Sequence, residues 1–299
     1  MSIKGNDVKY YKKNGYLTKN NLIPIKEINK INKLINKIIS IEKNKKIKTN
    51  DQGGTQTFDN FHFVYTNNSS KNKEILRLNN PQNNHKLFFN LSRNKKIISI
   101  VKKLIGGSVR FHLGKLNFKL PNKKKGSEIE WHQDWAFYPH TNDDLVTVGI
   151  YLEDCDEKNG PLKVISGSHK LSILSHHGKD NYFNGKINTK KNKININNSV
   201  SLTGAAGTVV FFHCRTIHGS GLNHMNSNRP LILFGYRACD AWPIIDDGNS
   251  HHDTNFNNYE KDIILGKKSL VPRCKNIPII IPLPKKKHFV SIYELQKNK

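Results

Sequence analysis

Residues 130–152 read EWHQDWAFYPHTNDDLVTVGIYL, a polar motif that leads directly into a β-branched, apolar run. The run Leu145 to Leu152 is bounded by acidic residues, as a buried strand commonly is. Similar runs, β-branched or aromatic and bounded by Gly, Asn, Asp or Pro, occur at Val109 to Leu120, Leu162 to Ile165, Thr208 to His213 and Leu231 to Tyr236. Such a series predicts a mainly β protein with the double-sheet jelly-roll fold.

Two amphipathic segments precede the strand series. Residues 25 to 40 carry Ile and Leu at helical spacing among Lys and Asn, which predicts a helix with one buried face. Residues 96 to 105, KIISIVKKLI, predict a second helix that ends at Gly106. The short aromatic run Phe61 to Tyr65 is expected to be extended.

The length of 299 residues and the lack of an internal repeat favour one domain. We expect residues 1–105 to form a mixed helical support, residues 106–240 the jelly-roll core, and residues 241–299 a C-terminal extension. Two polar stretches, Asn122 to Ser127 and His176 to Asn198, do not fit a compact barrel. Long insertions are commonly lids or disordered segments, and we favour an active-site lid for the second stretch.

The tripeptide His132-Gln133-Asp134 has the spacing of a metal-binding pair. Side chains at positions i and i+2 of an extended segment project from one face, so His132 and Asp134 can reach the same ion. Two imidazoles and one carboxylate form the facial triad of non-haem Fe(II) oxygenases, which leaves positions open for a co-substrate and O₂. The third ligand must come from elsewhere, and His213 and His218 are the candidates.

Short motifs around this pair resemble those of the phytanoyl-CoA dioxygenase (PhyH) family of Fe(II)/2-oxoglutarate oxygenases. The matching elements are WHQD at Trp131 to Asp134, NGPL at Asn159 to Leu162, GSHK at Gly167 to Lys170, HGSG at His218 to Gly221, and Arg229. DAWP at Asp240 to Pro243 and SIYE near the C-terminus resemble bacterial family members of unassigned substrate. The resemblance covers most of the chain and implies the same jelly-roll fold.

The resemblance also implies a ligand set for Fe(2+). His132, Asp134 and His218 are the expected ligands, because His218 has the family's spacing to Arg229, whereas His213 ends an apolar run. The carboxylate of Asp134 favours hydroxylation over halogenation, since related halogenases lack this carboxylate to make room for halide.

2-Oxoglutarate and O₂ are the implied co-substrates, with ascorbate as a supporting reductant. The family decarboxylates 2-oxoglutarate to succinate and CO₂ while it hydroxylates an unactivated C–H bond. The distal carboxylate of 2-oxoglutarate needs a cation in a fixed geometry, and the planar fork of Arg229 suits bidentate pairing. Ser220 is expected to add a hydroxyl donor, and Arg77 matches a basic residue that helps to bind the co-substrate.

A small-molecule metabolite is the expected substrate. Trp135, Phe137, Tyr138 and Trp242 predict a pocket of mixed apolar and polar character. One alternative is an acyl-CoA 2-hydroxylase acting on a phytanoyl-CoA-like substrate, whose phosphates would contact the lysines at 123–125. A different alternative is a metal-binding or RNA-binding jelly roll without catalytic activity, which only the net charge supports.

The net charge of +26 is compatible with a nucleic-acid partner, because clustered basic residues neutralise phosphates. The basic residues of this chain are mostly Lys scattered among Asn and Ile, without interleaved aromatic residues. This pattern favours a solvated surface. We therefore expect no specific nucleic-acid partner and no obligate protein partner.

The cysteines Cys155, Cys214, Cys239 and Cys274 show neither CxxC spacing nor a disulfide framework, which is typical of free thiols in a reducing compartment. The N-terminal residues lack a continuous apolar segment, and no stretch of 18 apolar residues occurs in the chain. The sequence therefore predicts a cytoplasmic protein without a membrane association.

Overall fold

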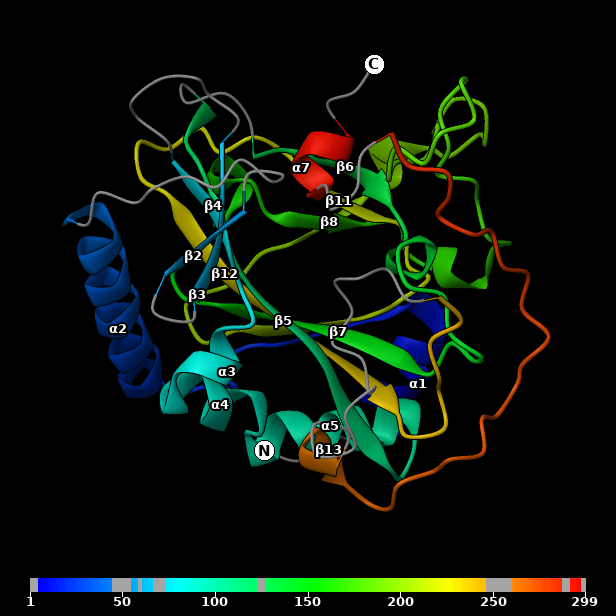
Figure 1. Ribbon diagram of the computed structural model, residues 1–299, viewed down its shortest axis with the longest axis horizontal. Helices are drawn as coiled ribbons and strands as arrows, with labels where there is room; N and C mark the ends of the chain where they lie inside the picture. The colour runs from blue at the N-terminus through cyan, green and yellow to red at the C-terminus, as the bar shows by residue number, and fades with distance from the viewer. Residues whose placement is uncertain are drawn as a thin grey trace.

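The computed structural model describes the chain at residues 5–44, 55–58, 61–66, 74–122, 127–245, 260–286 and 291–296. In this part of the chain the molecule has three layers (Figure 1). A small antiparallel sheet faces a large one, and helices cover the outer side of the large sheet. This arrangement is the predicted double-sheet jelly roll with flanking helices.

The large sheet has nine described strands, which follow the order β1-β10-β7-β12-β5-β4-β3-β2, with β13 paired to β5. They are β1 (Tyr16–Lys19), β2 (Thr55–Phe58), β3 (Phe61–Tyr65), β4 (Ile75–Asn79), β5 (Val109–Lys119), β7 (Leu145–Tyr151), β10 (Val209–His213), β12 (Arg229–Ala238) and β13 (Ile263–Leu265). Strands β1 to β4 come from the first 105 residues. The N-terminal segment therefore extends the sheet and does more than support it with helices. The division of the chain at residues 105 and 240 otherwise stays a prediction.

The small sheet has the strand order β6-β11-β8-β9. Its strands are β6 (Ile129–His132), β8 (Leu162–Val164), β9 (Val200–Leu202) and β11 (His218–Ser220). Apolar side chains from both sheets form one buried cluster between them, which contains Tyr151, Leu162, Val164, Leu202, Val210, Phe212 and Leu231. This cluster fixes the distance between the sheets and leaves room beside it for a pocket.

The described helices are α1 (Gly5–Asn14), α2 (Ile25–Asn44), α3 (Pro81–Asn84), α4 (Lys86–Ser92), α5 (Lys95–Ile105) and α7 (Ile292–Leu295). Both predicted helices are present, as α2 and α5. The Asn94 side chain caps α5 by accepting hydrogen bonds from the backbone N–H groups of Lys96 and Ile97. The helix ends at Gly106, whose φ of 109° is costly for any other residue.

Helices α2 and α5 dock on the large sheet through stripes of isoleucine. Ile28, Ile31 and Ile35 of α2 are all at most 3% exposed, which matches the predicted spacing. They belong to one core cluster with Val148 of β7 and Ile232 of β12. Burying each such side chain contributes about 1.5–3 kcal/mol, so this packing sets the position of the sheet.

Alternate residues of the same strands point the other way, toward the small sheet. On β5, Lys115, Asn117 and Lys119 line a pocket between the sheets, and on β12 Arg229 and Leu231 do so. The period of two therefore gives the large sheet an apolar outer face and an inner face on which these polar residues lie beside the apolar cluster. The polar part of the inner face is the location of the functional site.

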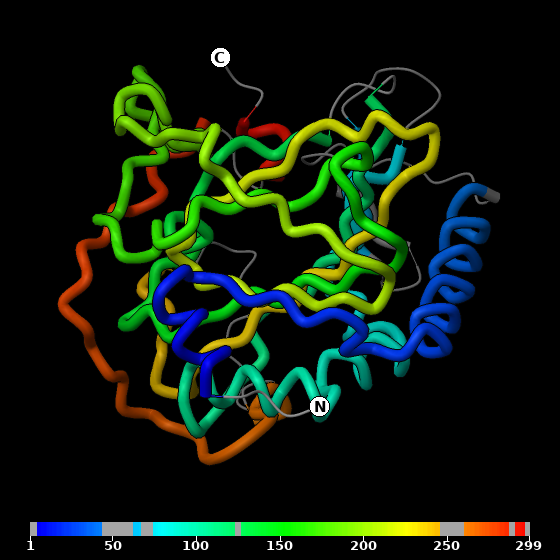
Figure 2. The backbone as a smooth tube through the Cα atoms, turned by 180° about the vertical axis from the view of Figure 1, so that it is seen from behind, coloured from blue at the N-terminus to red at the C-terminus, as the bar shows by residue number. Residues whose placement is uncertain are grey.

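Two long connections lie at the periphery of the barrel, as the view from behind in Figure 2 shows. Residues 176–198 form turns whose buried Phe183 packs against Phe137 and Leu295, so the predicted lid is packed along one edge of the site. Residues 266–286 run along one side of the molecule, where Lys275 forms ion pairs with Asp143 and Asp144. The basic loop predicted at 122–127 lies largely outside the described residues, because 123–126 are not described.

No helix in the described ranges combines the length and the apolar character that a membrane span requires.

Candidate metal centre and co-substrate pocket

Three side chains converge where the small sheet meets the pocket. β6 and β11 are antiparallel neighbours, and their register places His132 directly opposite His218. β6 ends at His132, and Asp134 opens a single 3-10 turn, Asp134–Ala136. The expected extended segment thus continues only through Gln133. Asp134 nevertheless turns its carboxylate toward both imidazoles.

Hydrogen bonds to the backbone orient both imidazoles in the same way. The Nδ1 atom of His132 lies 2.8 Å from the carbonyl oxygen of Glu130, and Nδ1 of His218 lies 2.9 Å from that of Thr216. A carbonyl oxygen can only accept a hydrogen bond, so in each neutral ring Nδ1 carries the proton. Each Nε2 is left with a lone pair, which is the form that binds a metal ion.

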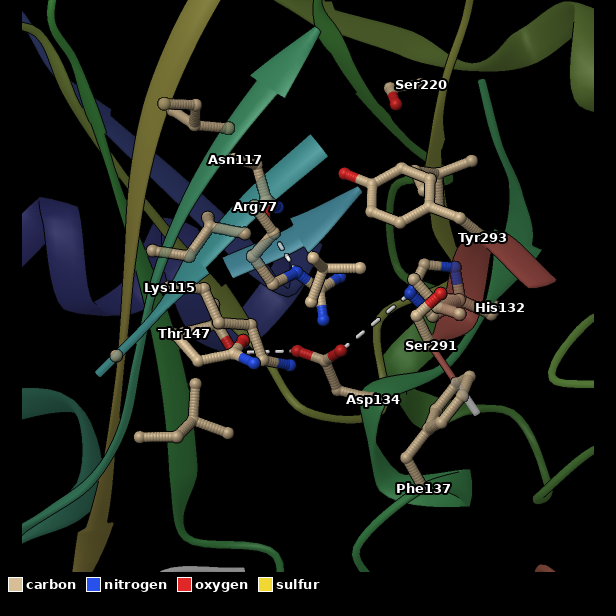
Figure 3. Close-up of a pocket in the computed structure, with 18 of the residues that line it drawn as sticks. Arg77, Lys115, Asn117, His132, Asp134, Phe137, Thr147, Ser220, Ser291 and Tyr293 are labelled. Atoms are coloured by element: carbon tan, nitrogen blue, oxygen red, sulfur yellow. Dashed lines mark hydrogen bonds and ion pairs between the residues drawn. The ribbon is translucent and has the colours of Figure 1, made fainter. Parts of the chain in front are cut away.

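The carboxylate of Asp134 is divided between two tasks. Its Oδ1 lies 3.8 Å from Nε2 of His132 and 3.7 Å from Nε2 of His218, while its Oδ2 accepts a hydrogen bond of 2.7 Å from the Thr147 hydroxyl (Figure 3). Burial opposes ionisation of Asp134, but its interactions with His218, His132 and Lys115 and the hydrogen bond from Thr147 outweigh burial and lower its pKa. The group is therefore an anion at neutral pH.

The three ligand atoms fit a divalent ion. One atom each from His132, Asp134 and His218 lies within 4.8 Å of the others, and the three residues are at least partly buried. Burial, reinforced by the neighbouring His218, lowers the pKa of His132 well below its ordinary value, so its imidazole is neutral. Two imidazoles and a carboxylate on one side of a site are the donor set of a non-haem Fe(II) centre.

His213, the other candidate ligand, lies elsewhere. Its Nε2 faces Asp143 at 3.7 Å, and its Nδ1 accepts a hydrogen bond from the backbone N–H of Arg215. The neutral ring therefore carries its proton on Nε2, so the nitrogen that faces the aspartate has no lone pair for a metal. His213 is also absent from the residues that line the pocket.

Arg229 begins β12 and is 3% exposed. Its Nε donates to the carbonyl oxygen of Asn159 and its Nη2 to that of Gly160, at 3.1 and 2.9 Å. Its Nη1 is buried and has no hydrogen-bond partner among the described residues. Because Arg229 lines the pocket, this guanidinium offers an unused donor to an anion there.

The NGPL motif gives Arg229 its orientation. Gly160 has φ +71°, and a Cβ atom built on it would lie 2.8 Å from the carbonyl oxygen of Gly221 and 2.9 Å from that of Leu222. Only glycine allows this approach of the NGPL and HGSG segments. The two motifs, far apart in sequence, therefore form one structure around Arg229.

Lys119 is a buried cation beside Arg229 that the sequence did not single out. The two residues are direct partners in the β5–β12 register. The ammonium of Lys119 donates at 2.6 Å to the Ser220 hydroxyl and at 2.6 Å to the carbonyl oxygen of Ser127. Burial, and then the charge of Arg229, lower the pKa of Lys119 well below its usual range. Ser220, an expected co-substrate contact, is thus brought to the same place as Arg229.

Arg77 lies on β4 and is 9% exposed. Its Nε donates to the Asn117 side chain at 2.9 Å, and its guanidinium lies 5.2 Å from the centre of the Tyr293 ring. In Figure 3 it extends into the same space as Lys115. Arg77 therefore shares the pocket with the metal triad and Arg229.

The pocket has a volume of about 590 Å³ and is lined by both sheets and by α7. Of the four aromatic residues expected to shape it, Phe137 and Tyr138 line it. Trp135 is buried in a separate core cluster, and Trp242 donates its ring N–H to the carbonyl oxygen of Ser269. Neither tryptophan lines the pocket. Tyr293 of the C-terminal SIYE segment forms part of the wall instead.

Residues 11–231 match the phytanoyl-CoA dioxygenase (PhyH) family. The chain belongs to this family. A probable alpha-ketoglutarate-dependent hypophosphite dioxygenase of Stutzerimonas stutzeri is 36% identical over 236 residues, which are 77% of this chain and 78% of that protein. An ectoine dioxygenase of Bordetella parapertussis is 30% identical over 169 residues, 50% of this chain and 53% of the relative.

Solved structures share the fold. The crystal structure of EctD from S. alaskensis with 2-oxoglutarate and 5-hydroxyectoine has a TM-score of 0.62 and 21% identity, and the match covers 79% of this chain and 77% of the EctD chain. The carbocyclase SnoK from nogalamycin biosynthesis has a TM-score of 0.57 and 19% identity, and the match covers 80% of this chain and 85% of the SnoK chain. The predicted jelly roll, which in these oxygenases is a double-stranded β-helix, is confirmed. Family membership makes the protein an Fe(II)/2-oxoglutarate-dependent dioxygenase, as expected.

Proposed function

We propose that His132, Asp134 and His218 hold the Fe(II), and that Arg229 holds the distal carboxylate of 2-oxoglutarate together with Lys119 and Ser220. The observation that carries the second assignment is the unpartnered Nη1 of a buried arginine inside the pocket. A buried cation without a counter-charge is costly, so the site is built for an anion. When bound, the iron with 2-oxoglutarate and O₂ supplies the oxidising power that hydroxylates a C–H bond, with release of succinate and CO₂.

The residues of this chain prepare the site before any ligand binds. The backbone carbonyls of Glu130 and Thr216 keep both Nε2 lone pairs directed at one point. Thr147 fixes the second carboxylate oxygen of Asp134, so that the first remains for the metal. Such supporting hydrogen bonds hold ligands in one geometry and reduce the reorganisation that binding requires.

The substrate we propose is a small-molecule metabolite, and the compartment is the cytoplasm. No disulfide joins the four cysteines, and Cys155, Cys214 and Cys239 are buried as free thiols, which supports a reducing environment. The pocket lies between the two sheets and is only partly closed by α7, a shape that suits a small ligand. We propose no role for nucleic acid.

The test of the co-substrate assignment is Arg229→Ala. Truncating one member of a buried charge pair costs roughly 2–5 kcal/mol. The KM for 2-oxoglutarate should therefore rise by about 30-fold to a few thousand-fold, at about 1.4 kcal/mol per decade, while Fe(II) binding persists. Arg229→Lys keeps the charge but loses the fork, so it should fall between wild type and Ala.

Two controls make this test specific. Pyruvate keeps the 2-oxo acid group but lacks the distal carboxylate, so it should not distinguish wild type from Arg229→Ala. Arg273 is an exposed arginine that pairs with Asp240 and Asp144, and Arg273→Ala should leave the KM for 2-oxoglutarate unchanged. An unchanged KM in Arg229→Ala would refute the assignment.

A further inference from the structure

The pocket carries more positive charge than iron and 2-oxoglutarate require. Its lining cations are Arg77, Lys115, Lys119, Lys285 and Arg229, whereas Asp134 is the one carboxylate among the described lining residues. A pocket between two sheets is partly shielded from water, so an unbalanced charge there is felt strongly by any ligand.

The charges of the iron site and the co-substrate can be counted against those of the lining. Fe(II) brings two positive charges, and Asp134 with 2-oxoglutarate brings three negative ones, so this assembly is left with one negative charge. Arg229 balances that charge, which leaves Lys119, Arg77, Lys115 and Lys285 as excess positive charge. Lys115 lies on β5 four residues from Lys119, the register partner of Arg229, and Arg77 lies on β4 at the level between these two lysines.

The strand register places Arg77 and Lys115 within reach of one small ligand. Arg77 is opposite Asn117, and Lys115 is opposite Asn79, so the two cations are diagonal neighbours on one face of the β4–β5 pair. Lys119 is the other diagonal neighbour of Arg77, but its ammonium already donates to Ser220 and Ser127. Diagonal neighbours in an antiparallel pair are about 7–8 Å apart. Two long cationic side chains at this spacing can bind the same oxyanion from two sides.

The surroundings of Arg77 fix its direction. Its Nε donates to Asn117, and its guanidinium lies beside the Tyr293 ring and interacts with the Tyr293 hydroxyl, so Arg77 is held at the wall of the pocket that it lines. No carboxylate pairs with Arg77 in the described part of the chain. Asn79, Asn80 and Asn83 also line this region and add amide groups that can donate to an oxyanion.

Lys115 connects this region to the metal. In Figure 3 its side chain extends toward Asp134, and both residues line the pocket. A ligand held by Lys115 and Arg77 would therefore lie next to the proposed iron position. The C–H or P–H bond that is oxidised must lie at this position beside the iron.

We propose that the substrate is a small oxyanion whose charged group binds between Arg77 and Lys115, an inference that rests on the proposed function. Carboxylates, phosphonates and phosphinates such as hypophosphite share this chemistry. The C–H or P–H bond beside the charged group gains one oxygen atom of O₂, and the other oxygen atom enters the new carboxylate of succinate as 2-oxoglutarate loses CO₂. The sequence assigned Arg77 to the co-substrate, and this proposal moves it to the substrate.

The experiment measures binding and turnover with defined probes. The protein is loaded with Fe(II) and 2-oxoglutarate without oxygen, and hypophosphite, methylphosphonate and propionate are titrated in, with propionamide as the neutral match of propionate. Admitting air then gives succinate formation for each probe. We expect at least one oxyanion to bind and to stimulate succinate formation, and propionamide to do neither. Comparison of the three oxyanions shows whether the substrate is a phosphinate, a phosphonate or a carboxylate.

Two pocket variants and one control assign the effect to residues. Arg77→Met and Lys115→Met should each raise the Kd and KM for the active oxyanion by at least about tenfold, because each removes one charge-assisted contact. The KM for 2-oxoglutarate should change by a much smaller factor. Lys163→Met, on β8 and outside the pocket lining, should change neither.

The outcomes discriminate between this proposal and the proposed function. If the wild type forms no succinate from 2-oxoglutarate under any condition, the proposed function itself fails. If succinate forms but no oxyanion exceeds propionamide, only the substrate class is wrong. If Arg77→Met raises the KM for 2-oxoglutarate and not that for the oxyanion, Arg77 belongs to the co-substrate and the proposal is overturned.

Discussion

The molecule contains two histidine–aspartate clusters in which the distance from the ring nitrogen to the carboxylate oxygen is nearly the same. The two clusters differ in the groups that surround these atoms. In the pocket, Asp134 lies 3.7 Å from the His218 ring nitrogen, and at the end of β10 Asp143 lies 3.7 Å from that of His213. Distance alone therefore does not distinguish a metal site from a structural ion pair. The two clusters are distinguished by whether the lone pairs of the carboxylate oxygens already accept hydrogen bonds.

In the second cluster the lone pairs are taken. Lys275 binds one oxygen of Asp143 at 2.8 Å and Arg215 binds the other at 3.0 Å, while His213 directs an N–H at the carboxylate. In the pocket, Oδ1 of Asp134 faces two imidazole nitrogens, and all three atoms carry lone pairs. These lone pairs repel one another unless a cation lies between them, so the cluster in the pocket suits a metal ion and the cluster around Asp143 does not.

The largest contrast should appear when each histidine is replaced. His218→Ala should abolish Fe(II)-dependent formation of succinate and weaken Fe(II) binding, because it removes one of three ligands. His213→Ala should retain iron and turnover, since its loss affects only the structural cluster. Metal content and succinate formation, measured on folded protein, check both. Activity in His218→Ala with loss in His213→Ala would invert the assignment.

A smaller contrast should appear when the supporting donors are removed. Thr147→Val deletes the hydroxyl that holds Oδ2 of Asp134 and keeps the side-chain shape, so Fe(II) affinity should fall by about 10- to 100-fold. Arg215→Met deletes the equivalent donor to Asp143, and should lower stability while Fe(II) affinity stays at the wild-type value. Titration of Fe(II) under anaerobic conditions measures both. Equal affinities in wild type and Thr147→Val would show that Asp134 does not need this hydroxyl.

The smallest effect should be on stability, through the pKa of Asp143. Burial raises this pKa, but the hydrogen bond from Lys275, the interaction with His213 and the hydrogen bond from Arg215 outweigh it and lower the pKa to about 2. The folded value lies below the ordinary one, so the ionised group stabilises the fold above about pH 4. That stabilisation is lost as the pH falls toward 2.

Asp143→Asn should therefore lower the free energy of unfolding by about 1–2 kcal/mol at pH 7, after allowance for the partial exposure of the cluster. The difference from wild type should shrink as the pH falls from 4 to 3. Urea unfolding at each pH measures it, and Glu157→Gln, which affects a surface ion pair, should show little difference at any pH. A difference that stays constant with pH would mean that the Asp143 carboxylate charge is not the stabilising feature.

Local patterns in the sequence predicted the parts of the fold that depend on local periodicity. The isoleucine stripe of α2 and the β-branched runs of β5, β7, β10 and β12 all appear close to their predicted positions. Their side chains alternate or repeat because one face of each element is buried, and that repeat is visible without a structure. The WHQD and HGSG motifs were equally visible, since their residue types are specific.

Arg229, Ser220 and Arg77 were found through the family resemblance, but the lysines that line the pocket were not visible in this way. Lys119 is one of 49 basic residues, and only its position opposite Arg229 in the β5–β12 register distinguishes it. Register is set by pairing between distant segments, which no short window contains. The small residues that complete the wall, such as Thr147, and the C-terminal Tyr293 were missed for the same reason.

The anchoring of Arg229 by the main chain has a consequence for how such a protein can change over time. The carbonyl groups of Asn159 and Gly160 that position its guanidinium exist whatever side chains surround them. A lineage whose composition shifts toward Lys, Asn and Ile can thus replace most of its surface without disturbing this arginine. Selection need only preserve one glycine and the path of the loop, so the anchor tolerates a degree of sequence drift that a guanidinium held by side chains would not survive.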